Sequence, residues 1–577
     1  MTDKITAEIL RCKFDAIVAE MRATLINTAC STTVSEANQC SSALFTESGL
    51  LVTIDNPVHL SSMSDTATAI FDYFQYDLGT EDVLLTNDPY GGGTHVQEFT
   101  AIAPVSFEDE IVLYVGVRAH MEDVGGDLRG NYNPRATEIW AEGIRCPPIK
   151  LYRDGKLLKD TLNTIALNSR NPNAFRLDLE AMMAALKTGQ RRIQEQIQSY
   201  GIKVVLGAMN WSIDYAESRF SAMLKTWANA THEGSCTLLH DCQDRENLSI
   251  KVDMEIKDGR LGLDFSATDD QSLSFVNTTP SLALGYALLP IFAAFNTDIP
   301  KNAGSLRCVD MITREGSLLN AKSSTPTGWA TAHVGSEIAL AVTDALSQFL
   351  PDKIANVVGN PLLLYTILRG IRHGYTVEQM DVIDYARFSQ GGCSGADGRD
   401  GWGMPGISAQ TPLPSVELFE AEFGGEIKKL EYVSDSAGAG QWRGGLGTAA
   451  SISLPVTESG DFYLTACVIP YQQQAGFVGG AAGSENAIRI SGSGEEVNVE
   501  RAYVDQLAGA DAELNILTGG GIGWGSPMLR APELVLSDVL NGLVSLEAAK
   551  TDYGVVIDPE NLQIDTGKTE NLRNQGQ

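Results

Sequence analysis

Two histidines, each followed three positions later by a carboxylate, are the residues of this sequence best suited to chemistry. His95 precedes Glu98 in TNDPYGGGTHVQEF, and His120 precedes Asp123 in AHMEDVGG. Neutral imidazole and carboxylate are the usual protein ligands of zinc and manganese. The pattern therefore indicates a divalent metal site. The alternative is a polar strand end whose histidines are satisfied by hydrogen bonds.

A predicted β-hairpin brings these side chains together. Residues 99–107 and 111–117 are rich in apolar, β-branched and aromatic residues, which predicts two strands joined by a polar turn. If the turn is centred on Asp109, residues whose numbers sum to about 218 face one another, with Cβ atoms about 5 Å apart. The facing pairs are then Glu98 with His120, and His95 with Asp123.

Composition limits the classes of function. The chain has 577 residues, enough for two to four domains, and a formal net charge of −31. That charge disfavours nucleic acid and an anionic membrane as partners, since both require a basic surface. The nine cysteines are scattered without a CxxC motif, which is typical of reduced thiols in a cytoplasmic protein. No apolar run reaches the roughly 18 residues of a membrane span, and the N-terminus lacks the features of a signal peptide.

Periodicity predicts an α+β protein of three regions. Residues 1–230 form an N-terminal mixed α/β domain with the metal site and long helices, and residues 231–385 form a mixed helix and strand region. Residues 386–577 form a β-rich, glycine-rich region. Apolar residues at helical spacing predict helices at residues 5–28, 177–200, 203–227, 281–295 and 335–349, the fourth broken by Pro290.

Glycine dominates the predicted C-terminal region. Glycines between 391 and 406 predict a convoluted loop, and this stretch and 519–525 are interpreted as interface or active-site loops. A helix is predicted at 532–552, and the polar residues after about 560 are predicted to be a loose tail. Strand-like runs are predicted at 416–419, 428–433, 449–454 and 461–468.

Several motifs in fixed order carry a resemblance to a known family. NDPYGGGTH and AHMEDVGG are followed by TEIWAEGIRCPPIKL, DSAGAGQWRGGLG and GLVSLEAAKTDYGVV. In these stretches the chain resembles the hydantoinase B/oxoprolinase family. Its members are the second subunit or half of ATP-dependent hydantoinases, 5-oxoprolinases and lactamases, and relatives are subunits of acetone and acetophenone carboxylases.

The resemblance implies a metal site made by His95, Glu98, His120 and the residue at position 39. Two positions depart from the family pattern. The family usually has an aspartate where this chain has Gln39, and an aspartate where it has Glu98. A neutral amide is a poorer ligand for a divalent cation than a carboxylate. We therefore expect a zinc or manganese site of reduced affinity, with catalytic roles for His120, Asp123 and His59.

The resemblance also implies a partner. The phosphate-binding motif GxxxxGK[ST] does not occur in the sequence. In the family, ATP is bound by a hydantoinase A-type subunit, so a hetero-oligomer with such a subunit is expected. Three functions remain: an ATP-dependent hydrolase of a hydantoin, 5-oxoproline or lactam, an ATP-dependent ketone carboxylase, and a non-catalytic scaffold subunit. The substrate is accordingly a small amide or ketone.

Overall fold

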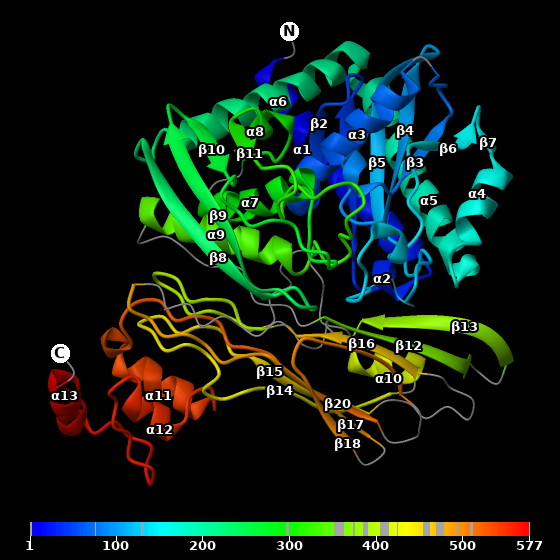
Figure 1. Ribbon diagram of the computed structural model, residues 1–577. Helices are drawn as coiled ribbons and strands as arrows, with labels where there is room; N and C mark the ends of the chain where they lie inside the picture. The colour runs from blue at the N-terminus through cyan, green and yellow to red at the C-terminus, as the bar shows by residue number, and fades with distance from the viewer. Residues whose placement is uncertain are drawn as a thin grey trace. The chain divides into compact units, whose positions relative to one another are not determined.

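The computed structural model describes residues 3–75, 77–128, 130, 132–295, 299–350, 363–372, 375–384, 391–403, 415–423, 425–453, 462–468, 478–492, 495–507 and 512–575. The chain divides into two compact units, the first made mainly of Met1–Phe349 and the second mainly of the residues from Leu350 to Gln577 (Figure 1). Residues 231–349 therefore share a unit with residues 1–230, unlike the predicted three-region division. The predicted boundary near residue 385 lies outside the described residues.

A seven-stranded sheet organises the first unit. Its strand order is β2-β1-β5-β4-β3-β6-β7, and every neighbouring pair for which we describe the register is antiparallel. The middle strands are buried along almost their whole length, because helices cover both faces. The strands are β1 (Cys40–Thr46), β2 (Leu51–Ile54), β3 (Val83–Thr86), β4 (Glu98–Phe107), β5 (Glu110–His120), β6 (Ile149–Arg153) and β7 (Lys156–Leu157).

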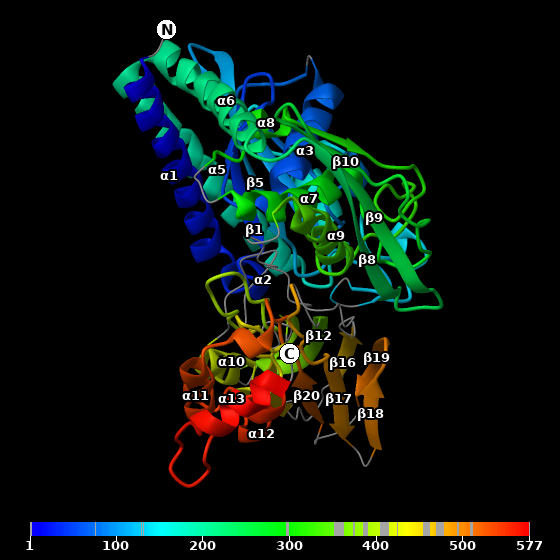
Figure 2. The same ribbon diagram turned by 90° about the vertical axis from the view of Figure 1, so that its left-hand side faces the viewer.

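Different helices cover the two faces of this sheet. On one face, α1 (Lys4–Thr28) and α5 (Pro172–Tyr200) pack on the central strands, and the ring of Phe99 meets Phe175 edge to face at 5.4 Å. On the other face lies α3 (Leu60–Phe74), whose Phe71 ring lies 4.2 Å from that of Tyr114. Figure 2 shows α6 (Ile202–Leu224) running beside α1. The short helices are α2 (Thr32–Ser35), η1 (Pro57–His59), η2 (Pro89–Gly91), η3 (Ile139–Ala141), α4 (Lys159–Ala166) and α8 (Ala303–Leu306).

The first unit also contains a four-stranded sheet of order β11-β10-β9-β8, packed on α9 (Val334–Phe349). Its strands are β8 (Ala230–His240), β9 (Glu246–Lys257), β10 (Arg260–Asp264) and β11 (Val309–Ile312). The turn between β9 and β10 is Asp258-Gly259. Both residues have positive φ, +52° and +79°, as a two-residue hairpin turn of this sequence requires.

The prediction that Pro290 breaks a helix is wrong. Helix α7 (Pro280–Ala294) continues through it. A proline inside a helix removes one backbone hydrogen bond and crowds the preceding turn. Here α7 is packed against α9, α3 and η1, and Pro290 itself is buried. Burial of an apolar helix on several sides outweighs the local cost of the proline.

The second unit holds two further sheets. One has the order β13-β12-β16-β19 and the other the order β14-β15-β20-β17-β18. The predicted strand at 416–419 is instead helix α10 (Val416–Phe423), whose apolar residues at 416, 419 and 423 have helical spacing. The strands are β12 (Leu363–Arg372), β13 (Tyr375–Asp384), β14 (Glu426–Tyr432), β15 (Thr448–Ser453), β16 (Phe462–Cys467), β17 (Ala487–Gly492), β18 (Glu495–Val499), β19 (Ala502–Leu507) and β20 (Glu513–Leu517).

The glycine-rich stretches of the second unit pack backbone to backbone. Residues 519–525 are buried, and an N–H···O bond joins Gly438 to Gly521 at 2.8 Å. Another joins Gly521 to Gly445 at 2.8 Å. A Cβ on Gly521 would lie 1.8 Å from the carbonyl oxygen of Cys393. In the described residues, these glycines therefore allow close packing within the unit. Their interpretation as interface or active-site loops stays a prediction.

We predict that Gly521→Ala destabilises the protein by at least ~2 kcal/mol, because the overlap is with backbone and cannot be relieved by a side-chain rotation. Thermal unfolding followed by circular dichroism measures the effect. Gly567→Ala is the matched control. Its Cβ would meet only Asp565 Oδ1 at 3.8 Å, in a helix, so stability should be unchanged or slightly higher. Equal melting temperatures for the two variants would contradict the close-packing role.

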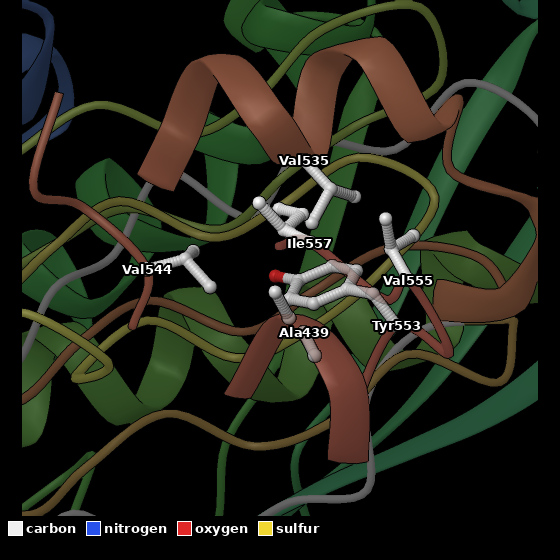
Figure 3. Packing of buried hydrophobic residues seen from close by; sticks show 7 residues of the cluster. Ala439, Val535, Val544, Tyr553, Val555 and Ile557 are labelled. Atoms are coloured by element: carbon white, nitrogen blue, oxygen red, sulfur yellow. The ribbon is translucent and has the colours of Figure 1, made fainter. Parts of the chain in front are cut away.

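The C-terminal segment is ordered by its own contacts. The single helix predicted at 532–552 is two helices, α11 (Pro532–Leu540) and α12 (Leu546–Thr551), separated by Gly542 with a φ of +70°. The predicted loose tail is helix α13 (Thr566–Gln575), whose Arg573 donates to the carbonyls of Tyr553 and Arg530. Figure 3 shows the core beneath, with the Tyr553 ring among Val535, Val544, Val555 and Ile557. No helix among the described residues is long and apolar enough to cross a membrane.

Candidate functional site

The hairpin of β4 and β5 places Glu98 directly opposite His120, the register predicted from the sequence. The sum of the paired numbers stays at 218 from this pair to Val105 and Leu113, where a bulge shifts it by one. Side chains at positions of the same parity share a face of the sheet. Glu98, Thr100, Arg118 and His120 therefore all lie on the face covered by α3. These four buried side chains form a polar patch within an otherwise apolar core.

His59 reaches this patch from the start of α3. It ends η1, is 5% exposed, and its Nδ1 lies 2.9 Å from Ser41 Oγ of β1. Its Nε2 lies 3.5 Å from Glu98 Oε2. Helix α7 approaches η1 closely, because a Cβ on Gly285 would lie only 2.0 Å from the Val58 carbonyl oxygen. A glycine at position 285 thus helps to fix the backbone beside His59.

Thr94 determines which nitrogen of His95 carries a proton. The Thr94 hydroxyl makes a short hydrogen bond to Glu98 Oε2 and also lies 3.0 Å from His95 Nδ1. A hydroxyl has one proton to donate, and the ionised carboxylate can only accept it. Thr94 Oγ must then accept from His95 Nδ1–H. Nε2 of a neutral His95 therefore carries a free lone pair, and it is buried without a hydrogen-bond partner among the described residues.

Burial sets the charge state of the cluster. It lowers the pKa of His59 and of His95 to about 4, and that of His120 to about 3. Burial alone would raise the pKa of Glu98. His59 and His95, which are protonated in the acid range where Glu98 titrates, and the cationic Arg118 outweigh burial and bring that pKa to about 2. Near neutral pH the cluster accordingly holds three neutral imidazoles around one carboxylate.

His95 and His120 are brought together as predicted, with ring centroids 5.0 Å apart. His120 also stacks on Tyr132, at 6.0 Å between centroids and 7° between planes. Its backbone N–H donates to the carbonyl oxygen of Gln39, so residue 39 is a neighbour of the cluster. Sequence reasoning missed Thr94 and Tyr132. The only signal for Thr94 was its place beside His95.

Asp123 has a different environment from the one predicted. It lies beyond the end of β5, and His95 lies before the start of β4, so the two do not face each other in the ladder. The Asp123 carboxylate instead accepts from the backbone N–H groups of Gly125 and Arg170 and from Arg170 Nη1 at 3.1 Å. These contacts give Asp123 a structural role, in orienting the loop that follows β5.

A second buried carboxylate, also missed by sequence reasoning, is that of Glu142. Glu142 accepts from the backbone N–H groups of Thr327 and Gly328 at 2.9 and 2.7 Å. Burial raises the pKa of Glu142 to about 8 against the lowering effect of these two bonds. A Cβ on Gly328 would lie 3.6 Å from Gln97 Nε2, and Gln97 is the neighbour of Glu98. The segment beginning at Thr327 is thus placed beside β4.

The residues present do not make a complete metal site. The His95 Nε2 lone pair is oriented as a ligand would be, with the opposite nitrogen hydrogen-bonded. Glu98 Oε2, however, already accepts from Thr94 and faces His59. Among the described residues, no three His, Cys, Asp or Glu side chains are arranged to hold a metal ion. Gln39 adds no charge, so the residues of the cluster do not supply the donors and charge that a divalent metal ion requires.

We predict that Gln39→Asp increases the content of zinc or manganese in the purified protein. A carboxylate beside His120 would add the charge and the oxygen donor that the amide lacks. Metal content is measured by inductively coupled plasma mass spectrometry after dialysis against each ion. Gln39→Asn is the control, since it keeps the amide. A Gln39→Asp protein that retains no more metal than Gln39→Asn would show that position 39 does not limit binding.

Comparison with known proteins assigns the chain to a family. The family model described as hydantoinase B/oxoprolinase matches residues 3–527. The chain belongs to the hydantoinase B/oxoprolinase family. The cluster of His59, His95, Glu98 and His120 therefore lies within the part of the chain that the hydantoinase B family shares.

Relatives match along nearly the whole length of this hydantoinase B chain. An uncharacterized protein of Methanocaldococcus jannaschii is 29% identical, over 99% of this chain and 100% of its own. The caprolactamase subunit beta of Pseudomonas jessenii is 28% identical, over 98% of both chains. A crystal structure of the ATP-dependent caprolactamase from Pseudomonas jessenii matches all of both chains with a TM-score of 0.88 and 25% identity. An acetone carboxylase structure has the same fold, with a TM-score of 0.88 at 16% identity over 99% of this chain and 83% of its own.

Proposed function

We propose that the chain is the hydantoinase B-type subunit of an ATP-dependent enzyme that hydrolyses a cyclic amide, such as a lactam, a hydantoin or 5-oxoproline. The similarity to caprolactamase subunit beta, which extends over 98% of both chains, supports this substrate class. The observation that carries a catalytic role is the buried Nε2 lone pair of His95, which has no hydrogen-bond partner in the part of the chain that the structure describes. A buried polar atom without a partner costs stability, which makes His95 Nε2 a candidate for a functional role.

ATP is assigned in this proposal to a hydantoinase A-type partner. The phosphate-binding motif GxxxxGK[ST] is absent from the sequence. The surplus of acidic residues, 73 against 42 basic ones, also gives an anionic nucleotide little electrostatic attraction. The partner would phosphorylate the amide oxygen, which makes the ring carbon electrophilic, and this chain would carry out the ring opening. The isolated chain should then hydrolyse no ATP.

The residues of the cluster have distinct roles in this proposal. Water adds to the activated carbon while His95 Nε2 accepts one of its protons and passes it to the ring nitrogen. The C–N bond then breaks to release the amine, and a second water hydrolyses the resulting acyl phosphate to a carboxylate and inorganic phosphate. Thr94 keeps the proton of His95 on Nδ1, so that Nε2 is available as the base. The Glu98 carboxylate, facing His59 Nε2, stabilises the positive charge that develops on His95, since its Oε2 lies 3.9 Å from Nδ1. The stack of His120 on Tyr132 forms the adjacent wall.

Isotope labelling separates this function from the two alternatives. The chain and its partner are incubated with ATP, ¹⁸O-labelled water and ¹³C-bicarbonate, with caprolactam, hydantoin, 5-oxoproline, acetone and acetophenone as substrates. A ring-opened product that contains ¹⁸O and no ¹³C supports the proposal. A product that retains ¹³C indicates a ketone carboxylase. Full turnover by a complex carrying His95→Ala would instead indicate a scaffold subunit.

A further inference from the structure

A second buried histidine and carboxylate lie in the first unit, outside the candidate site. His333 is fully buried, and Glu337, one turn later in α9, is 3% exposed. His333 Nδ1 lies 3.1 Å from Glu337 Oε1. Its other ring nitrogen, Nε2, lies 3.2 Å from the backbone carbonyl oxygen of His240 in β8. Both nitrogens of His333 thus face oxygen atoms.

These contacts fix the number of protons on the pair. A carbonyl oxygen only accepts, so His333 Nε2 must carry a proton. With that proton in place, a neutral imidazole has a bare lone pair at Nδ1, which would repel the lone pairs of an ionised Glu337. The 3.1 Å contact therefore requires one further proton, held by Nδ1 or by Oε1. The pair is then electrically neutral in total.

The surroundings agree with a neutral pair. Among the described residues, the titratable side chains near it include Cys236 and His240 of β8 and, further along α9, Asp344, which accepts from the backbone N–H of Ser235. Burial raises the pKa of Cys236, whose thiol stays uncharged, and His240 accepts the N–H of Cys242 on Nδ1. Within the part of the chain that the structure describes, no lysine or arginine forms an ion pair with Glu337. An unprotonated pair would leave a buried negative charge uncompensated, which is strongly unfavourable.

The pair holds one end of the segment 327–333, whose other end lies beside the candidate site. At the first end, Thr327 and Gly328 donate to Glu142, next to Gln97. In the middle, Trp329 donates its backbone N–H to Phe275, and its ring lies 4.9 Å from that of His333. At the C-terminal end of the segment, His333 hydrogen-bonds to the His240 carbonyl of β8 and to Glu337 of α9.

We propose that His333 and Glu337 share a proton that the folded protein retains, and that this neutral pair positions segment 327–333 as one wall of the site. The positioning role rests on the proposed function, whereas the shared proton does not. His333 and Glu337 are positioning residues, because neither is within reach of the cluster around His95. Gln at position 337 would satisfy His333 Nδ1 with an amide N–H, without any shared proton.

The shared proton is tested by measuring the net charge of the folded full-length chain with capillary electrophoresis near neutral pH. Glu337→Gln should migrate with the wild type, because an already neutral pair loses no charge. Glu315→Gln, at an exposed position, should lose one unit of negative charge and serves as the calibration. Equal mobility shifts in the two variants would overturn the shared proton.

If Glu337→Gln does not fold, ¹⁵N spectra of the wild-type histidines replace it. His333 should then show either two protonated nitrogens or an Nδ1 that accepts a strong hydrogen bond, and a free Nδ1 would overturn the proposal.

The positioning role is tested in the complex with its ATP-binding partner. Glu337→Ala removes the partner of His333 Nδ1 and is expected to lower kcat/KM about tenfold, mainly through KM, as the loss of one buried charge-assisted hydrogen bond would. Glu337→Gln should stay within about twofold of the wild type. A Gln variant as impaired as the Ala variant would contradict the role. Failure of the proposed function would instead leave every variant inactive, with the electrophoretic result intact.

Discussion

His95→Ala is expected to reduce turnover by the complex ~10²–10⁴-fold, the usual contribution of a general base. Burial lowers the pKa of His95 to about 4, so the imidazole is uncharged near neutral pH, and its Nε2 lone pair has no hydrogen-bond partner among the described residues. That lone pair is therefore free to take a proton from water. Removing this buried side chain leaves a cavity and deprives Thr94 of a hydrogen-bond partner, so some loss of stability should accompany the loss of activity. Steady-state kinetics with saturating ATP, together with a melting curve, separate loss of activity from loss of folding.

Matched variants distinguish a base from a metal ligand. Thr94→Val removes the hydroxyl that keeps the proton on Nδ1, so it should lower kcat by about tenfold while Thr94→Ser restores it. His120→Ala should cost less than His95→Ala if His95 acts as a base. If both variants are equally inactive and the wild type retains a metal ion, the two histidines act as ligands and the base role is incorrect. Retention of full turnover by His95→Ala would contradict either role.

The part of the site encoded by local periodicity could be predicted from the sequence. Two apolar runs around a polar turn specify a hairpin, and counting from the turn pairs Glu98 with His120. The same logic located the longest helices, because an apolar stripe at helical spacing must be buried. The mixed helix and sheet fold is confirmed as well. In each case the information lies within a few neighbouring residues.

Features that depend on distant contacts could not be predicted. The place of His59 depends on Gly285, more than 200 positions away, and that of Glu142 on Thr327. The local sequence of the glycine-rich stretches looks like that of surface loops. Nevertheless, their backbones pack against one another within the second unit. The prediction that Asp123 faces His95 continues the hairpin beyond its last residue pair. At that point the chain turns toward Arg170, whose backbone N–H donates to Asp123. Tertiary packing, rather than propensity, decides each of these positions.

Arg118→Met is expected to destabilise the first unit by ~3–5 kcal/mol, the largest effect on stability of any single substitution that we propose. The guanidinium is fully buried between β5 and α3. It donates to Thr100 Oγ at 2.8 Å, to Ser62 Oγ at 2.6 Å and to Thr66 Oγ at 2.9 Å. Methionine fills a similar volume but leaves these three hydroxyls without their donor. Urea unfolding, monitored by tryptophan fluorescence, measures the change.

The same substitution should also reduce activity in the fraction that folds. Arg118 is one of the groups that hold Glu98 ionised, and only an ionised Glu98 requires the hydrogen of Thr94. Without that charge the pKa of Glu98 rises toward the value that burial favours, and His95 loses its fixed tautomer. Arg118→Lys keeps the positive charge but forms fewer of the hydrogen bonds, so it should lose stability while retaining more turnover than Arg118→Met.

Arg153→Met, at a side chain that is 56% exposed, is the control and should change neither stability nor turnover. An Arg118→Met protein with wild-type stability would show that the buried cation is dispensable, because its three hydroxyl partners would then satisfy one another.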